Sequence, residues 1–170
     1  MSTAADAHAE PHPDAERHRA AEEWVAGFAA GWRDPAGPRE FVEHFSPLLD
    51  PEIRLIQPLM PELVGLEAFR RGFAEPLFDL IPDIHGTVRG WAADGHTIWI
   101  ELEIEGTLGG RPVTIETIDR ITLHEGRAIE RRAFLDPLPL LGAVLTRPRA
   151  WPRFARTQSI QIRELLRRAR

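Results

Sequence analysis

Two alternating segments joined by a glycine pair constrain the fold of this chain more than any other feature. Apolar and polar side chains alternate through residues 97–108 and again through residues 111–123. This alternation indicates two half-buried β-strands, and Gly109-Gly110 between them is a typical two-residue hairpin turn. Counting outwards from that turn places Asp119 opposite Ile100. The sequence therefore predicts an aspartate on the buried face of a β-hairpin.

The residue that faces Asp119 on the next strand depends on the second turn. Residues 127–135 form the last predicted strand, after Glu125-Gly126. A two-residue turn would require positive φ at Glu125, which is costly for any residue but glycine. A three-residue turn with Gly126 in the left-handed conformation is therefore expected, and it places Arg131 opposite Asp119. The alternative register places Arg132 there.

Helical patterns precede these strands. Apolar spacing predicts helices over residues 14–32, around Phe41 and Phe45, and over residues 65–80. A separate strand over residues 52–57 carries Gln57 on its apolar face. Helices followed by regularly spaced strands predict an α+β domain, a curved antiparallel sheet with helices on one face.

The composition excludes several kinds of chemistry. The chain has no cysteine, which removes disulfides and thiolate catalysis, and no tyrosine. It also lacks lysine, because all 21 basic residues are arginine, so Schiff-base chemistry is excluded. No apolar run reaches the ~20 residues of a membrane helix, and no signal peptide is recognisable. We expect a cytoplasmic protein.

Charge is distributed unevenly along the chain. The net charge is −5, yet residues 146–170 contain eight arginines and a single acid. We expect residues 1–13 to be a disordered leader, residues 14–145 the domain, and residues 146–170 an Arg-rich, helical C-terminal extension. Charge complementarity favours docking of this extension on the acidic body or on a sister subunit. An arm for anionic surfaces and a solvated tail are the alternatives, but no recognition motif supports nucleic-acid binding, so neither nucleic acid nor membrane is expected as a partner.

Four local phrases, in order, resemble a known family. They are Ile56-Gln-Pro58 with Gly65, residues 78–84, residues 105–112, and residues 118–137. Together they resemble SnoaL-like polyketide cyclases, within the nuclear transport factor two-like superfamily that includes ketosteroid isomerase and limonene epoxide hydrolase. The resemblance spans about residues 14–145. It implies a cone-shaped curved sheet with three N-terminal helices on its concave face, and a homodimer formed through the sheet.

The resemblance carries over to individual positions only in part. Asp119 falls where isomerase-like sequences place an oxyanion-hole aspartate, but Gln57 stands near the position of their general base. In the epoxide hydrolase pattern two aspartates flank an arginine. Asp119 and Asp136 are the candidates for the aspartates, whereas Thr117 stands where the arginine is expected. Arg131 or Arg132 is the candidate substitute for that arginine. Both patterns also require a tyrosine that this chain lacks.

SnoaL-like cyclases need less: a closed apolar pocket and one aspartate that exchanges protons. The resemblance thus implies a cofactor-independent enzyme that cyclises, isomerises or dehydrates an apolar, polyketide-type carbonyl compound, without metal. The catalytic candidates are Asp119 and Asp136, although a surface or capping role for Asp136 is an alternative. The expected substrate contacts are Gln57, Trp24, Phe28, Phe73, Thr117 and Arg131. The alternative is a non-catalytic ligand-binding or dimerisation module in which Asp119 forms a structural ion pair.

Overall fold

The structure, a computed structural model, describes the backbone of residues 13–168 and the side chains of residues 15–159. The predicted leader lies almost entirely outside the described residues. The helical first half of the chain includes one short strand pair and consists of α1 (Pro13–Arg33), α2 (Pro38–Phe45), a 3₁₀ turn (Ser46–Leu48), β1 (Leu49–Ile56), β2 (Leu63–Val64), α3 (Leu66–Ala68), a π-helical segment (Phe69–Ala74) and α4 (Glu75–Leu80).

Long strands make up most of the second half of the chain. They are followed by two helices and a short 3₁₀ turn. These elements are β3 (His85–Asp94), β4 (Thr97–Leu108), β5 (Arg111–His124), β6 (Arg127–Leu135), α5 (Leu138–Leu145), the 3₁₀ turn (Pro148–Ala150) and α6 (Trp151–Arg168).

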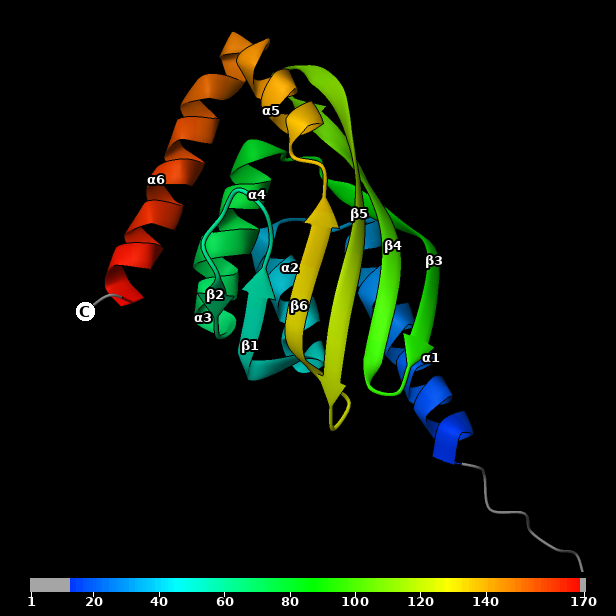
Figure 1. Cartoon of the computed structure of the whole chain (residues 1–170). Helices are drawn as coiled ribbons and strands as arrows, with labels where there is room; N and C mark the ends of the chain where they lie inside the picture. The colour runs from blue at the N-terminus through cyan, green and yellow to red at the C-terminus, as the bar shows by residue number, and fades with distance from the viewer. Residues whose placement is uncertain (1–12, 169–170) are drawn as a thin grey trace, which may run out of the picture.

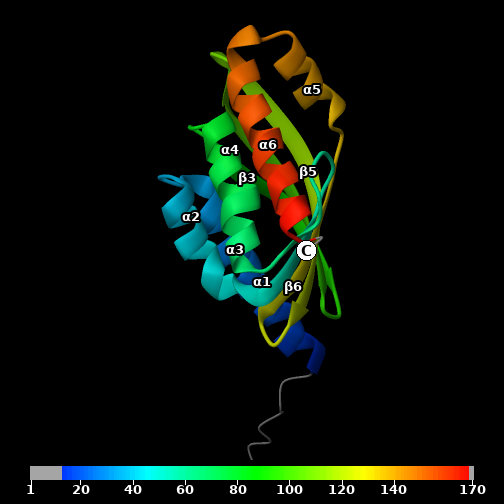
Figure 2. The same ribbon diagram turned by 90° about the vertical axis from the view of Figure 1, so that its left-hand side faces the viewer.

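All six strands belong to one curved, open sheet in the order β2-β1-β6-β5-β4-β3 (Figure 1). Neighbouring strands are antiparallel except β1 and β6, which run parallel. Helices α1, α2 and α4 lie together on one side of the sheet (Figure 2). The α+β architecture expected from the sequence is therefore confirmed, with one parallel strand pair added to the antiparallel sheet.

The first hairpin has the register that its glycine pair predicts. Leu108 lies opposite Arg111, and Ile100 lies opposite Asp119. Ile98, Ile100 and Asp119 are all fully buried or nearly so, which places the aspartate on the core face.

The register predicted for the second hairpin is wrong. Glu125 adopts a φ of 50° and Gly126 a φ of 78°, so the chain turns in two residues after all. A bulge opposite Thr122 then inserts one extra residue into β6. As a result Asp119 lies opposite Ala133, and neither Arg131 nor Arg132 faces it directly. Arg131 lies opposite Ile121, two residues along, on the same buried face.

The core between helices and sheet is rich in aromatic rings. Phe41 of α2 lies within 6.4 Å, centroid to centroid, of rings from α1, the π-helical segment and α4. Such offset and edge-on ring pairs add stability beyond the burial of apolar area. The buried aromatic side chains are Trp24, Phe28, Trp32, Phe41, Phe45, Phe69, Phe73 and Phe78.

The third predicted helix exists but is irregular in its centre. Pro76 lacks an N–H and cannot donate to the carbonyl of Gly72, four residues earlier. The preceding residue, Glu75, donates its N–H to the carbonyl of Arg70, five residues back, as in a π-helix. This wider turn carries Phe73, whose side chain is buried toward the sheet.

The C-terminal extension turns back over the helical layer. Helix α6 runs alongside α4 in both views (Figures 1 and 2). Arg156 Nη1 lies 3.2 Å from Asp79 Oδ1 of α4, and the Thr157 hydroxyl donates to the carbonyl of Pro76 at 3.4 Å. Among residues 13–168, no helix is both long and apolar enough to cross a membrane.

Candidate functional site

A buried polar network lies inside the otherwise apolar core. Asp119 is fully buried, and its Oδ2 accepts a hydrogen bond from Arg131 Nε at 2.7 Å. Its other oxygen, Oδ1, accepts from the Thr117 hydroxyl at 3.3 Å. Arg131 Nη1 donates to Gln57 Oε1 at 3.2 Å. The network therefore unites four of the residues that the sequence singles out as site candidates.

Three strands position this network. Thr117 and Asp119 lie two residues apart on β5 and so project from the same face. On β6 the bulge brings Arg131 onto that face, next to Asp119. Leu55 of β1 pairs with Arg131, and Gln57 follows two residues later, where the strand has ended. The polar groups thus meet at the parallel β1/β6 junction, beneath the helices.

An apolar cavity adjoins the arginine. The guanidinium carbon of Arg131 lies 5.2 Å from the centroid of the Phe73 ring, a cation–π distance. The cavity beside them measures ≈ 20 Å³, about the space of one water molecule. The predicted contacts Trp24 and Phe28 line it. The apolar pocket is thus present, but aromatic side chains nearly fill it.

A second chamber of ≈ 100 Å³ lies toward the outside of the same network. Gln57 and Phe73 line this chamber, and Phe73 also lines the inner cavity. Phe154 and Thr157 of α6 form part of the chamber wall. Reasoning from the sequence missed these two residues, although the apolar residues of the extension were a signal that it packs against something.

Asp136 lies apart from the network. Its Oδ1 accepts the N–H of Leu138 at 2.9 Å, at the start of α5, and the residue is exposed. This contact is an Asx turn that leads into α5, and the exposed side chain is in keeping with the surface role considered as the alternative for this residue.

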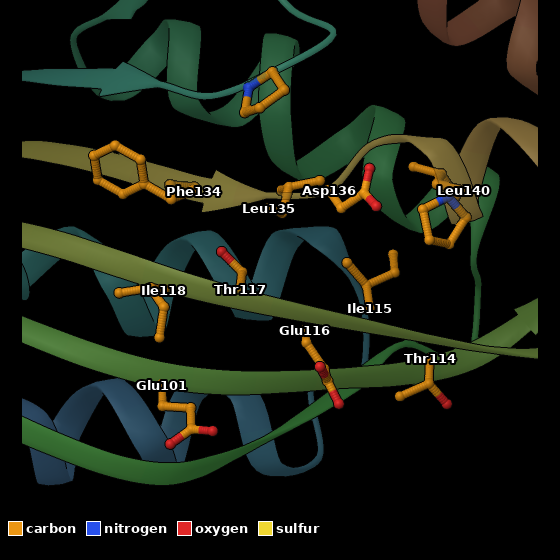
Figure 3. Close-up of a pocket in the computed structure, with 13 residues that line it drawn as sticks. Glu101, Thr114, Ile115, Glu116, Thr117, Ile118, Phe134, Leu135, Asp136 and Leu140 are labelled. Carbon is orange, nitrogen blue, oxygen red and sulfur yellow. The ribbon is translucent and has the colours of Figure 1, made fainter.

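Asp136 also lines a wide outer hollow of ≈ 720 Å³ (Figure 3). The close-up shows side chains from β4, β5, β6 and α5 around it, including Glu101 and Glu116. Neither Asp119 nor Arg131 lines this hollow. Thr117 is the member of the network that borders the hollow, but the buried Asp119–Arg131 pair does not, so we place the site at the network.

The described part of the chain holds no group of three or more histidine, aspartate or glutamate side chains that could bind a metal ion. The groups available for chemistry at the network are therefore one carboxylate, one guanidinium, one amide and one hydroxyl. They can accept a proton, donate hydrogen bonds to an oxygen and stabilise negative charge.

A curved open sheet with helices packed on one side and polar groups between the two layers is typical of the cone-shaped nuclear transport factor two-like domains. The model of the SnoaL-like domain family matches residues 21–131, and the chain belongs to that family. No curated protein matches the chain significantly.

Solved structures share this fold at low sequence identity. A protein from Jannaschia sp. CCS1 described as a SnoaL-like polyketide cyclase is 21% identical with a TM-score of 0.62, over 80% of this chain and 96% of its own. An LEH-like epoxide hydrolase of M. tuberculosis is 14% identical with a TM-score of 0.59, over 78% and 95%. AclR from Streptomyces galilaeus, described as a hydroxylase, is 16% identical with a TM-score of 0.55, over 78% and 97%. The fold is therefore one on which small-molecule enzymes are built.

Proposed function

We propose that this protein is a cofactor-independent enzyme that acts on an apolar carbonyl compound of polyketide type. The observation that carries this proposal is the buried Asp119–Arg131–Gln57 network, of which Arg131 lines the inner apolar cavity and Gln57 lines the adjoining chamber. Buried ionic groups are expensive to maintain and cluster at functional sites. The polyketide cyclase and epoxide hydrolase named among the structural neighbours support a small-molecule substrate.

The free donors of the network suit a carbonyl oxygen. Two donor atoms, Arg131 Nη2 and Gln57 Nε2, form no hydrogen bond with another described residue. A substrate carbonyl oxygen held by them would carry the negative charge of an enolate at low cost, because fixed donors in a dry site need no reorganisation. Apolar rings around the site would exclude water.

Asp119 would move the proton. Its carboxylate accepts a proton from the carbon next to the carbonyl, and the electron pair of that C–H bond becomes the enolate. Return of the proton to another carbon isomerises the substrate. In a cyclisation the enolate carbon instead attacks a second carbonyl, a C–C bond forms, and the new alkoxide takes the proton back from Asp119. In a dehydration, Asp119 would then remove a second proton from the carbon next to the carbonyl and give it to the departing hydroxyl, so that water leaves and a C=C bond forms.

A non-catalytic ligand-binding module is the second candidate. Both carboxylate oxygens of Asp119 already have hydrogen-bond partners, and the inner cavity is small. In this second account Asp119 ties β5 to β6 through Arg131, and the cavity only holds a ligand.

Proton exchange on a simple ketone separates the two candidates. We would incubate the protein with 2-tetralone, a bicyclic apolar ketone, in D2O and follow loss of its α-proton signals by ¹H NMR. The proposal predicts exchange faster than in buffer, and a loss of about 10²–10⁴-fold in Asp119→Asn, typical for removal of a general base. Asp94→Asn, an exposed carboxylate at the end of β3, is the matched control.

Other outcomes contradict the proposal. Binding of the ketone without accelerated exchange assigns the protein to the binding modules. A loss in Asp136→Asn equal to that in Asp119→Asn moves the proton transfer to the outer hollow. Absence of both binding and exchange rules out apolar ketones as the substrate class.

A further inference from the structure

The ligand site as it stands is too small for a ligand. Pockets that hold small molecules usually measure about 300–1,000 Å³, whereas the inner cavity and the chamber measure ≈ 20 Å³ and ≈ 100 Å³. Both are bordered by Phe73, which separates them. An element that borders the site must therefore move before a bicyclic ligand can enter.

Helix α6 is the element that the contacts single out. We propose that α6 is a movable outer wall of the ligand site: it opens to admit an apolar ligand and, once closed, contacts that ligand through Phe154 and Thr157. This inference rests on the ligand cavity of the proposed function. It adds residues beyond the part of the chain that the family model matches, residues 21–131.

The side of α6 that faces α4 is held weakly. Its ion pair to Asp79 involves Arg156, whose side chain is 64% exposed, and exposed ion pairs contribute little to stability. The hydrogen bond from Thr157 to Pro76 is long, at 3.4 Å. Phe154 is only partly buried against the core. Opening of this part of the helix would break these contacts, all of which involve the described side chains of residues 151–159.

The start of α6 and the segment before it are held more firmly. Arg147 donates to the carbonyls of Leu108, Arg111 and Pro112 at 3.0 to 3.2 Å, which fixes the segment before α6 to the β4–β5 hairpin. Trp151 Nε1 donates to the carbonyl of Val144 at 2.9 Å. A helix that is anchored at its start and weakly held against α4 can swing open about the anchored end.

Opening of α6 would join the chamber to the inner cavity, because the Phe73 ring between them could then rotate. This ring lies on the π-helical segment, and π-helical turns are frequent at functional sites. Rotation of the ring would place an apolar ligand against the aromatic wall, with its oxygen at Gln57 and Arg131. A competing entrance exists past Leu135 and Leu140, which border both the chamber and the outer hollow.

Tethering α6 to α4 tests the proposal. The chain contains no cysteine, so Asp79→Cys/Arg156→Cys introduces the only two thiols, and a short bis-maleimide can link them. Uptake of the neutral apolar dye N-phenyl-1-naphthylamine is followed by stopped-flow fluorescence in the linked and unlinked forms. The matched control is Arg39→Cys/Glu43→Cys, linked within α2, where the ion pair spans 3.0 Å on the surface.

The linked protein should take up dye at least tenfold more slowly than the unlinked one, while linking within α2 changes nothing. Phe154→Ala, which removes the proposed contact, should lower the affinity for the dye with the fold intact. Equal uptake by linked and unlinked protein overturns the proposal and assigns entry to the route past Leu135. Absence of uptake in every form also overturns it. If linking slows dye uptake but the protein does not accelerate proton exchange of 2-tetralone, the proposal for α6 stands and only the proposed enzyme activity is contradicted.

Discussion

Among single residues, the buried carboxylate of Asp119 depends most on one partner. Removal of one member of a buried ion pair leaves an uncompensated charge and costs about 3–5 kcal/mol. We expect Asp119→Asn and Arg131→Met each to lower the free energy of unfolding by this amount. The double variant should lose much less than the sum, because it leaves no orphaned charge. Urea denaturation measures all three, and strictly additive losses would contradict the pairing.

A second carboxylate links the fold to pH. Hydrogen bonding by the side chain of Thr107, and by its backbone N–H, which donates to Asp83 Oδ1 at 2.7 Å, lowers the pKa of Asp83 below its ordinary 3.8. A lowered folded-state pKa means that the carboxylate stabilises the fold above the unfolded pKa. That contribution is lost as the pH falls through the folded value.

Asp83→Asn should therefore have a lower Tm than the wild type at pH 7, and the gap should close in acid. Circular dichroism melts across the acid range measure this gap. A gap of constant size down to the lowest pH would show that the charge of Asp83 contributes nothing.

Among the structural elements, the turn between β5 and β6 carries avoidable strain. Glu125 is in the left-handed conformation, which costs an ordinary residue about 1–2 kcal/mol, whereas Asn-Gly favours this type of turn. Glu125→Asn should raise the free energy of unfolding by about 1 kcal/mol. The reference variant Gly126→Ala should lower it. Thermal melts measure the stability of both variants, and a Glu125→Asn variant less stable than the wild type would contradict the turn geometry.

The two hairpins differ in how far the sequence determines them. Gly109-Gly110 fits a two-residue turn, and the alternation around it leaves one register, so the position of Asp119 on the buried face could be predicted. The second turn and the bulge in β6 could not, because the strain at Glu125 is small beside the burial of a whole strand. Arg131 nevertheless reaches Asp119, since the extra residue in β6 brings Arg131 onto the buried face that carries Asp119.

The position of α6 depends on the whole molecule. Its arginines and interspersed apolar residues predict a helix that docks on another surface, but no local pattern specifies α4 as that surface. That choice depends on the shape of a chamber assembled from the segment after β1, the π-helical segment, α4 and the end of β6. The family resemblance also implies a closed apolar pocket, and the packing of aromatic side chains from several elements leaves little space inside it.

At the scale of the whole molecule, the outer sheet face remains uncovered. The rings of Trp99 and Phe134 stack 6.4 Å apart on it, 41% and 48% exposed, beside Ile118. Exposed apolar clusters of this kind favour association, so we predict a homodimer through this face. Light scattering should detect the dimer, and Trp99→Ser/Phe134→Ser should shift it to monomer. Leu145→Ser, elsewhere on the surface, is the control; a wild type that stays monomeric would contradict the prediction.

The central claim is that a ligand meets the Asp119–Arg131–Gln57 network inside the sheet. The most direct measurement is a titration of ¹⁵N-labelled protein with 2-tetralone, observing the side-chain amide of Gln57 and the Nε of Arg131 by NMR. We predict that both signals shift saturably, together with the backbone amide of Phe73. Shifts confined to Glu116 and Phe134 at the outer hollow, with Gln57 and Arg131 unchanged, would contradict the claim.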